Sequence, residues 1–309
     1  MEKRTNRKKK RKPRIFRRIL FTILLVILMV GGYAAYQFYQ GVKQAGDTEK
    51  QDFEFNGEKD ANGRINVLLI GIDKREGDQK SHSDTMMVAQ YDPKKDQAKI
   101  VSLMRDMYVP IPGYDENKLN TAYFLGGPEL LRKTLKQDFD IDVQYYMMID
   151  FKGFEHAIDA LAPDGIEINV EKAMSKNIGV SLQPGVQKLN GKELLGYARF
   201  RHDSESDFGR VRRQQQVIKV VTNEITSANG LAKAPKMLGT IQPYVQTNIS
   251  AIDRLSLMKE LFFFNTNNIK SLTLPIKDTY SDARIDGKGL VLQVDMEKNK
   301  QAVSQFLNK

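Results

Sequence analysis

The chain has 309 residues, no cysteine, three histidines and a formal net charge of +10 at pH 7. Without cysteine it cannot use a catalytic thiol, a zinc–thiolate site or an iron–sulfur cluster. The positive charge is confined to residues 1–18, which hold eleven Lys and Arg against one Glu, while residues 19–309 hold 37 basic and 37 acidic side chains. A nucleic-acid-binding domain would keep its positive charge on the fold, so no nucleic-acid partner is expected.

A run of 24 uncharged residues, 19–42, follows the basic tail. As a helix, that length crosses about 30 Å of hydrocarbon, and Tyr33, Tyr36 and Tyr39 suit an interfacial belt. The alternative is a cleaved signal peptide, but the apolar run is long for one and offers a poor cleavage site. The positive-inside rule predicts a single-pass type II signal anchor in the cell membrane, with the tail in the cytoplasm and the remainder extracytoplasmic.

Residues 43–60 are polar, contain glycine, and predict a stalk. Residues 61–309 suit a single domain of α/β class, because continuous apolar strands alternate with helices, which is typical of a sheet covered on both faces. The strands are expected at residues 65–71, 85–91, 98–104, 144–149, 166–170 and 269–274. The helices are expected at residues 127–137, 151–161, 207–227, 235–244 and 251–263, and at the C-terminus.

Residues 197–216, YARFRHDSESDFGRVRRQQQ, place five arginines among several acids. Arg199 and Arg201 stand two apart in a run expected to be a strand, so both side chains should leave one face. In the helix that follows, Arg210 and Gln214 fall within the apolar stripe, which predicts that they point inward.

Two interpretations of this arginine-rich segment are open. Guanidinium groups that converge match phosphate oxygens bidentately, which favours a phosphate or diphosphate site. The alternative is a structural ion-pair network with the segment's own acids, which are Asp203, Glu205 and Asp207.

Two aspartates flank the loop after the first strand. Asp73 ends that strand and Asp84 begins the next, with Arg75 in the loop between them. Ligand sites gather at such strand ends in α/β sheets, and Mg²⁺ typically takes one or two carboxylates together with substrate phosphate oxygens. Loop aspartates also cap turns, so the residues alone leave both roles open.

A further group of polar residues follows the strand at 98–104. Arg105 leaves the apolar run IVSLM and is therefore expected at a strand end of the sheet. Lys118 and Asn120 stand just before a helix-like TAYFLGG. Lys118 would add a cation to a diphosphate site or would simply be solvated.

Four segments in order carry a resemblance to a known family: GIDKR…SDTMM, SLMRDMYV, KLNTAYFLGG and YARFRHDSESDFGRVRRQQQ. Over residues 61–230 and after one basic-flanked anchor, the chain resembles the LytR–CpsA–Psr family, the cell-wall polymer ligases of mostly Gram-positive bacteria. Within that family it looks most similar to the teichoic-acid-attaching members.

The resemblance implies a three-layer α/β/α domain with a cavity for a polyprenyl chain. It also implies transfer of a phosphoglycosyl polymer, such as wall teichoic acid, from undecaprenyl diphosphate to peptidoglycan. The acceptor is expected to be the C6 hydroxyl of N-acetylmuramic acid.

The same resemblance assigns roles to individual residues. Asp73 and Asp84 match the Mg²⁺-binding aspartates, with Mn²⁺ as a substitute ion. The catalytic diphosphate-binding positions are Arg105, Arg199, Arg201, Arg210 and Gln214. Lys118 and Asp207 match supporting positions, and His82 stands where many members carry arginine. Arg75 and Asn120, which stand next to these motifs, are further predicted substrate-binding positions.

Two other functions use the same features. A lipid-diphosphate phosphatase would employ the same site with water as the acceptor. A membrane-bound transcription attenuator is suggested by the family's older regulatory name and by the basic tail, although an eighteen-residue tail contains no DNA-reading fold.

Overall fold

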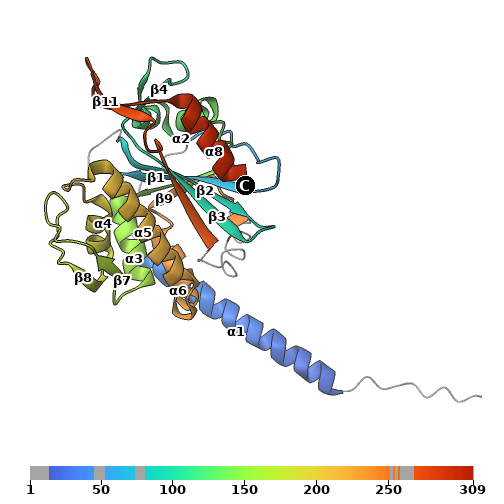
Figure 1. Ribbon diagram of the computed structural model, residues 1–309. Coiled ribbons are helices and arrows are strands. Elements are labelled where there is room, and N and C mark those ends of the chain that lie inside the picture. The colour runs from blue at the N-terminus through green and yellow to red at the C-terminus, as the bar shows by residue number, and fades with distance from the viewer. Residues whose placement is uncertain are drawn as a thin grey trace, which may run out of the picture.

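The computed structural model describes residues 14–44, 53–73, 81–250, 253–254, 257 and 268–308. Its domain has three layers, with a six-stranded sheet between two groups of helices (Figure 1). The strand order is β10-β3-β2-β1-β6-β9. These strands are β1 (Ile65–Ile72), β2 (Ser83–Asp92), β3 (Gln97–Leu103), β6 (Tyr145–Asp150), β9 (Val245–Thr247) and β10 (Ile269–Leu274). The α/β/α architecture expected from the resemblance is confirmed.

The sheet is mixed, and its central strands set the position of the chemistry. β1 pairs antiparallel with β2 and parallel with β6, and β3 runs antiparallel to β2. The end of β1, the start of β2 and the end of β3 therefore meet at one edge. Gly71 pairs with Thr85 at this edge, so the loop between β1 and β2 opens there.

One face of the sheet is covered by α2 (Leu119–Phe139) and α8 (Met296–Asn308). Alternate residues of β1, namely Leu68, Ile70 and Ile72, are buried in the core on this face. The core also takes Leu131 and Leu135 from α2. Burial of each such side chain stabilises the fold by about 1.5–3 kcal/mol, so this layer holds the sheet firmly.

The other face carries α3 (Phe151–Leu161), α4 (Gly191–Arg199), α5 (Ser206–Thr226) and α6 (Ala228–Ile241). These helices form a second core with the hairpin of β7 (Ile166–Val170) and β8 (Gly185–Leu189). Among the described residues, that core includes none from the six-stranded sheet. Helix α5 reaches the first core through Val211 and Phe208, whereas most other buried apolar residues of these helices belong to the second core, and a cavity lies between the helices and the sheet.

A smaller sheet stands beside the strand edge where β1 and β3 end. Its order is β11-β12-β4-β5, with β4 at Met107–Val109, β5 at Asn117–Lys118, β11 at Tyr280–Ile285 and β12 at Gly289–Val294. β4 follows β3 after only three residues, so Arg105 lies at the junction of the two sheets.

The N-terminal helix α1 (Arg14–Gln44) projects from the domain next to α6 (Figure 1). Its segment Arg17–Lys43 is long and apolar enough to cross a membrane. The last turns of α1 cross α6 with the backbones in close contact at Gly41 and Gly239. A Cβ on Gly41 would collide with the Lys236 carbonyl, and one on Gly239 with the Phe38 carbonyl. Two glycines facing each other allow this approach, as small residues do at helix crossings.

The prediction of a stalk at residues 43–60 is wrong for residues 53–60. Phe53 and Phe55 pack against Tyr146 of β6, at ring-centroid distances of 6.5 and 4.9 Å. The Glu58 N–H donates to the Val143 carbonyl at 2.9 Å. This segment therefore belongs to the domain, because its aromatic side chains find an apolar surface that is formed only by the fold.

Most of the expected elements form, with two changes at the candidate site. The helix expected at 127–137 begins at Leu119 and continues past a kink at Gly126 and Gly127. The run expected to be a strand around Arg199 is the end of helix α4. Most of the helix expected at 251–263 lies outside the described residues.

Candidate functional site

A cavity of about 510 Å³ lies between the six-stranded sheet and helices α3 to α5. It has a charged end at the strand edge and an apolar end beneath the helices. The charged and polar lining includes Asp73, Asp84, Thr85, Arg105, Arg199, Arg201, Arg210 and Gln214. The apolar lining includes Leu69, Met87, Met147, Phe154, Leu195, Val217 and Ile218. Such a cavity suits a ligand that carries an anion at one end and hydrocarbon at the other.

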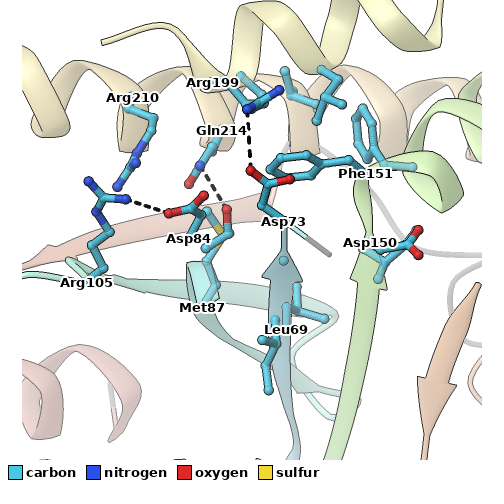
Figure 2. Close-up of a pocket in the computed structure, with 18 of the residues that line it drawn as sticks. Leu69, Asp73, Asp84, Met87, Arg105, Asp150, Phe151, Arg199, Arg210 and Gln214 are labelled. Carbon is cyan, nitrogen blue, oxygen red and sulfur yellow. Dashed lines mark hydrogen bonds and ion pairs between the residues drawn. The ribbon is translucent and has the colours of Figure 1, made fainter. Parts of the chain in front are cut away.

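At the charged end, side chains from the helices face side chains from the sheet (Figure 2). Arg105 Nη1 lies 2.5 Å from Asp84 Oδ1, and Arg199 Nη2 lies 3.9 Å from Asp73 Oδ2. The Gln214 amide donates to the Thr85 hydroxyl at 2.9 Å, which ties α5 to β2. The Arg199 guanidinium also stacks over the Phe151 ring at 4.3 Å. Residues far apart in sequence are therefore assembled at one place.

Arg210 is the most deeply buried cation that lines this cavity, with 5% of its surface exposed. Its Nη2 is 2.9 Å from Asp207 Oδ2, but its Nε has no hydrogen-bond partner among the described residues. Burial lowers the pKa of Arg210, and the neighbouring Arg105 and Arg201 lower it further against the opposing effect of Asp207 and Asp84. A buried guanidinium that is incompletely paired is costly, and a bound anion would lower that cost.

The charge of Arg105 is balanced by more carboxylates than the charge of Arg210. Burial by itself would lower its pKa, but Asp207, Asp106 and Asp84 together raise the pKa above the ordinary value. These carboxylates lie within 3.6 Å of the guanidinium. The Arg105 carbonyl accepts from the Asn120 N–H at 3.2 Å, which fixes the backbone where β3 ends. Arg105 is thus held in place before any ligand binds.

Local capping brings Arg199 and Arg201 to the cavity. Asn190 caps α4 in a reciprocal capping box with Glu193, each accepting from the other's backbone N–H at 3.0 Å. The helix ends at Arg199, and Phe200 adopts extended backbone before Arg201. The expectation that Arg199 and Arg201 share a strand is therefore wrong. A helix end followed by an extended residue still allows both to line the cavity.

The turn before α5 is built around Asp203. Its carboxylate accepts from the N–H groups of Glu205 and Ser206 at 3.1 Å, and it also lies 2.9 Å from Arg213 Nη1. Burial alone would raise the pKa of Asp203, but Arg213 and Lys172 together outweigh it and the pKa lies below the ordinary value. Asp203 is therefore structural, since it connects the start of α5 to the interior of the helix layer.

Arg213 and Arg212 form the ion-pair network that the sequence left open. Arg213 is fully buried, donates to the Phe200 carbonyl at 2.7 Å, and lies 2.7 Å from Glu171. Arg212 pairs with Glu171 and Glu205 at 2.7 and 2.8 Å on the outside of the helix. The ion-pair interpretation is therefore confirmed for Arg212 and Arg213, each of which pairs with two carboxylates. Arg210 pairs with Asp207 alone, and the phosphate-site interpretation stays a prediction for it.

Several residues expected at the site lie elsewhere. Lys118 Nζ pairs with Asp106 at 2.9 Å, and neither Lys118 nor Asn120 lines the cavity. His82 stacks on Phe124 of α2 at 4.5 Å and is also absent from the lining. Arg75 lies outside the described residues. Their roles in substrate binding stay predictions that rest on the resemblance.

The cavity also has lining residues that sequence reasoning missed. Lys176 and Asn177 reach it from the loop between β7 and β8, and Phe151 and Phe154 from the first turn of α3. The loop carries no pattern that marks it. Arg213 does not line the cavity, but its burial could have been predicted, because it stands 60° from Arg210 on a helix and so shares the inward stripe.

Asp73 and Asp84 are the two carboxylates of the predicted magnesium site. Both line the charged end, and the described residues contain no group of three or more potential metal ligands. Mg²⁺ does not need a closed protein cage, because it takes one or two carboxylates and completes its shell with water and phosphate oxygens. The residues present therefore fit an ion that is held jointly by the protein and a diphosphate.

Taken together, the fold and the cavity define an α/β/α protein with an arginine-rich strand edge, an apolar slot and an N-terminal helix that fits a membrane anchor. The LytR_cpsA_psr family model matches residues 32–305. The chain belongs to this family.

Named relatives fall into two groups. Regulatory protein MsrR of Staphylococcus aureus is 47% identical over 278 residues, which cover 89% of this chain and 85% of the relative. The polyisoprenyl-teichoic acid–peptidoglycan teichoic acid transferase TagU of Oceanobacillus iheyensis is 33% identical over 294 residues, or 89% of each chain. A solved structure of TagT, a Bacillus subtilis protein, bound to LI-WTA is 25% identical, with a TM-score of 0.63 over 86% of this chain and 98% of TagT.

Proposed function

We propose that this protein transfers a phosphoglycosyl polymer from a polyprenyl diphosphate to a hydroxyl of peptidoglycan. The observation that carries the proposal is the cavity with arginines at one end and hydrocarbon side chains at the other. An undecaprenyl diphosphate likewise has a charged diphosphate at one end and a long hydrocarbon chain at the other. Relatives named as polyisoprenyl-teichoic acid–peptidoglycan teichoic acid transferases support teichoic acid as the polymer and peptidoglycan as the acceptor. The C6 hydroxyl of N-acetylmuramic acid as the reacting group rests on the resemblance.

In this proposal the arginines hold the diphosphate and stabilise the charge that grows on it. The acceptor hydroxyl oxygen forms a bond to the phosphorus that carries the glycan. The bond from that phosphorus to the bridging oxygen breaks, its electron pair stays on the lipid phosphate, and the hydroxyl proton passes to a carboxylate of the site. Arg105 and Arg210 lie where this negative charge develops, and such preorganised donors lower the barrier to phosphoryl transfer.

We assign Mg²⁺ to Asp73 and Asp84, with Mn²⁺ as a substitute. When bound, the ion would neutralise negative charge on the diphosphate oxygens. The pairing of Asp84 with Arg105 would keep that carboxylate oriented towards the ligand. Gln214, tied to Thr85, would keep α5 at the right distance from the strand edge.

The transferase proposal is tested by incubating the purified full chain with an undecaprenyl-diphosphate glycan, a peptidoglycan glycan and Mg²⁺. We expect a glycan–peptidoglycan product, no product with EDTA, and recovery when Mg²⁺ is added back. Full activity in EDTA would remove the metal role from Asp73 and Asp84. If glycan phosphate is released at the same rate with and without acceptor, the protein is a lipid-diphosphate phosphatase and not a transferase.

Charge supports an extracytoplasmic domain. Because the basic residues precede Ile19 and the remaining chain is balanced in charge, we propose that residues 1–18 are cytoplasmic and the domain is outside the membrane. The same balance argues against binding DNA. Protease added to intact protoplasts should digest the domain and leave a small anchored fragment. Complete protection of the domain would contradict this topology and, with it, the access to peptidoglycan.

A further inference from the structure

A second cavity, of about 540 Å³, adjoins the first at its charged end. Three residues line both cavities, namely Arg105, Arg201 and His202. Its other walls come from different elements: the first turn of α5, β11 and β12 of the small sheet, and the segment where β3 meets β4. A molecule bound in the second cavity would therefore touch the same arginines as a diphosphate bound in the first.

The chemistry of the second cavity differs from that of the first. Its lining carries four carboxylates, from Asp106, Glu205, Asp207 and Asp282, and the hydroxyls of Ser204 and Ser206. A second lipid phosphate is a poor occupant, because the carboxylates would repel it. A molecule rich in hydroxyl groups suits this lining, since ionised carboxylates only accept hydrogen bonds and hydroxyls donate them.

Aromatic side chains also line the second cavity. Phe208 and Tyr280 contact each other with ring centroids 5.1 Å apart, and Leu290 on β12 is 67% exposed beside them. Exposed apolar side chains in a polar cavity favour a ligand with an apolar face. The C–H faces of pyranose rings provide such a face, whereas the phosphates of a nucleotide would be repelled by the carboxylates.

Asp282 is the clearest unused group on this wall. It lies on β11, is exposed, and makes no ion pair with any residue in the described part of the chain. The other three carboxylates already pair with Lys118, Arg212 or Arg210. Asp282 is thus available to accept hydrogen bonds from a ligand.

We propose that the second cavity binds the acceptor glycan, a polyhydroxylated sugar chain whose reacting hydroxyl is directed at the arginines shared with the first cavity. This inference rests on the proposed transferase function and extends it. Tyr280 supplies the surface for a sugar ring, and Asp282 accepts from its hydroxyls. Donor and acceptor then occupy separate cavities that meet at Arg105 and Arg201, which brings the hydroxyl next to the phosphorus.

The test measures transfer by the full chain to a defined, peptide-free N-acetylated glycan at a saturating concentration of donor. We expect Asp282→Asn and Tyr280→Ala each to raise KM for the glycan about 10-fold, the scale of one lost hydrogen bond or ring contact. The kcat should fall less than about 3-fold, and Kd for undecaprenyl diphosphate should not change, because neither residue lines the first cavity.

Matched controls come from the same part of the molecule. Asp286 lies on the same hairpin but lines neither cavity, and Tyr114 is an exposed tyrosine elsewhere. The variants Asp286→Asn and Tyr114→Ala should both leave KM for the glycan unchanged. Tyr280 packs on the main core, so its variant requires an unchanged donor Kd as evidence of folding. Asp282 is exposed and carries the test if Tyr280→Ala does not fold.

The possible results distinguish a failure of the proposed acceptor cavity from a failure of the proposed transferase function. If the wild-type protein transfers and Asp282→Asn has the wild-type KM for the glycan, the acceptor cavity is wrong while the transferase proposal stands. If the wild-type protein forms no product with any acceptor but binds the donor, the proposed function fails first. A rise in donor Kd for Asp282→Asn would also overturn the inference, since it would place this carboxylate at the donor.

Discussion

Replacement of Arg210 by alanine is expected to reduce the transfer rate by about 100-fold or more, the usual effect of deleting one preorganised charge-stabilising donor. Binding of undecaprenyl diphosphate should weaken by about 30-fold, which corresponds to about 2 kcal/mol for a lost buried charge-assisted contact. The free energy of unfolding without ligand should change little or rise, because Arg210 has one carboxylate partner, Asp207, and lies near two other cations.

Calorimetric titration with the lipid and thermal unfolding of the same preparations would check this result. Lys219→Ala is the control, since it removes an exposed cation from the same helix and should alter neither affinity nor stability by more than about 0.5 kcal/mol. A destabilised Arg210→Ala protein that binds the lipid normally would show that Arg210 belongs to the structural network instead.

Arg213→Met is expected to have the opposite effect, a loss of about 3 kcal/mol in the free energy of unfolding with lipid affinity unchanged. Methionine approximates the aliphatic part of the side chain but removes a fully buried cation from Asp203, Glu171 and the Phe200 carbonyl. Removal of one partner from a buried ion pair typically costs about 3–5 kcal/mol. The lower value applies because Glu171 keeps Arg212 and Asp203 keeps Lys172.

Urea unfolding of the purified protein measures this loss. Arg212→Met is the matched control: it shares Glu171 with Arg213, but 38% of its side chain is exposed, so it should cost less than about 1 kcal/mol. Equal losses for the two variants would mean that burial does not determine the strength of this network. A stable Arg213→Met protein would remove its structural role altogether.

The strand edge of the site could be predicted because its residues lie next to apolar runs. Asp73 and Arg105 follow strands, Asp84 lies at the start of one, and the antiparallel pairing of β1 and β2 places them together. The inward direction of Arg210 and Gln214 also followed from helical periodicity, and both line the cavity. These are local patterns, and the fold preserves them.

What depended on tertiary contacts was harder to predict. Arg199 was expected on a strand because the arginines alternate, yet the capping box of Asn190 and Glu193 starts a helix nine residues earlier. Phe53 and Phe55 stood in a polar segment, and only β6 provides the Tyr146 ring that buries them. Lys176 and Asn177 approach the cavity from a distant loop, so no short pattern could place them there.

The close crossing of α1 and α6 at Gly41 and Gly239 has a consequence for how the protein would search for its donor. A helix joined to its domain by backbone contact cannot swivel independently, so the domain loses rotational freedom relative to the anchor. With α1 in a membrane, both cavities would stay at a constant height above the lipid surface. A lipid-linked donor diffuses in that same plane. The protein and its donor would then meet by diffusion in two dimensions, at a constant distance from the membrane. The length of the polymer, which extends away from the surface, would not affect this encounter.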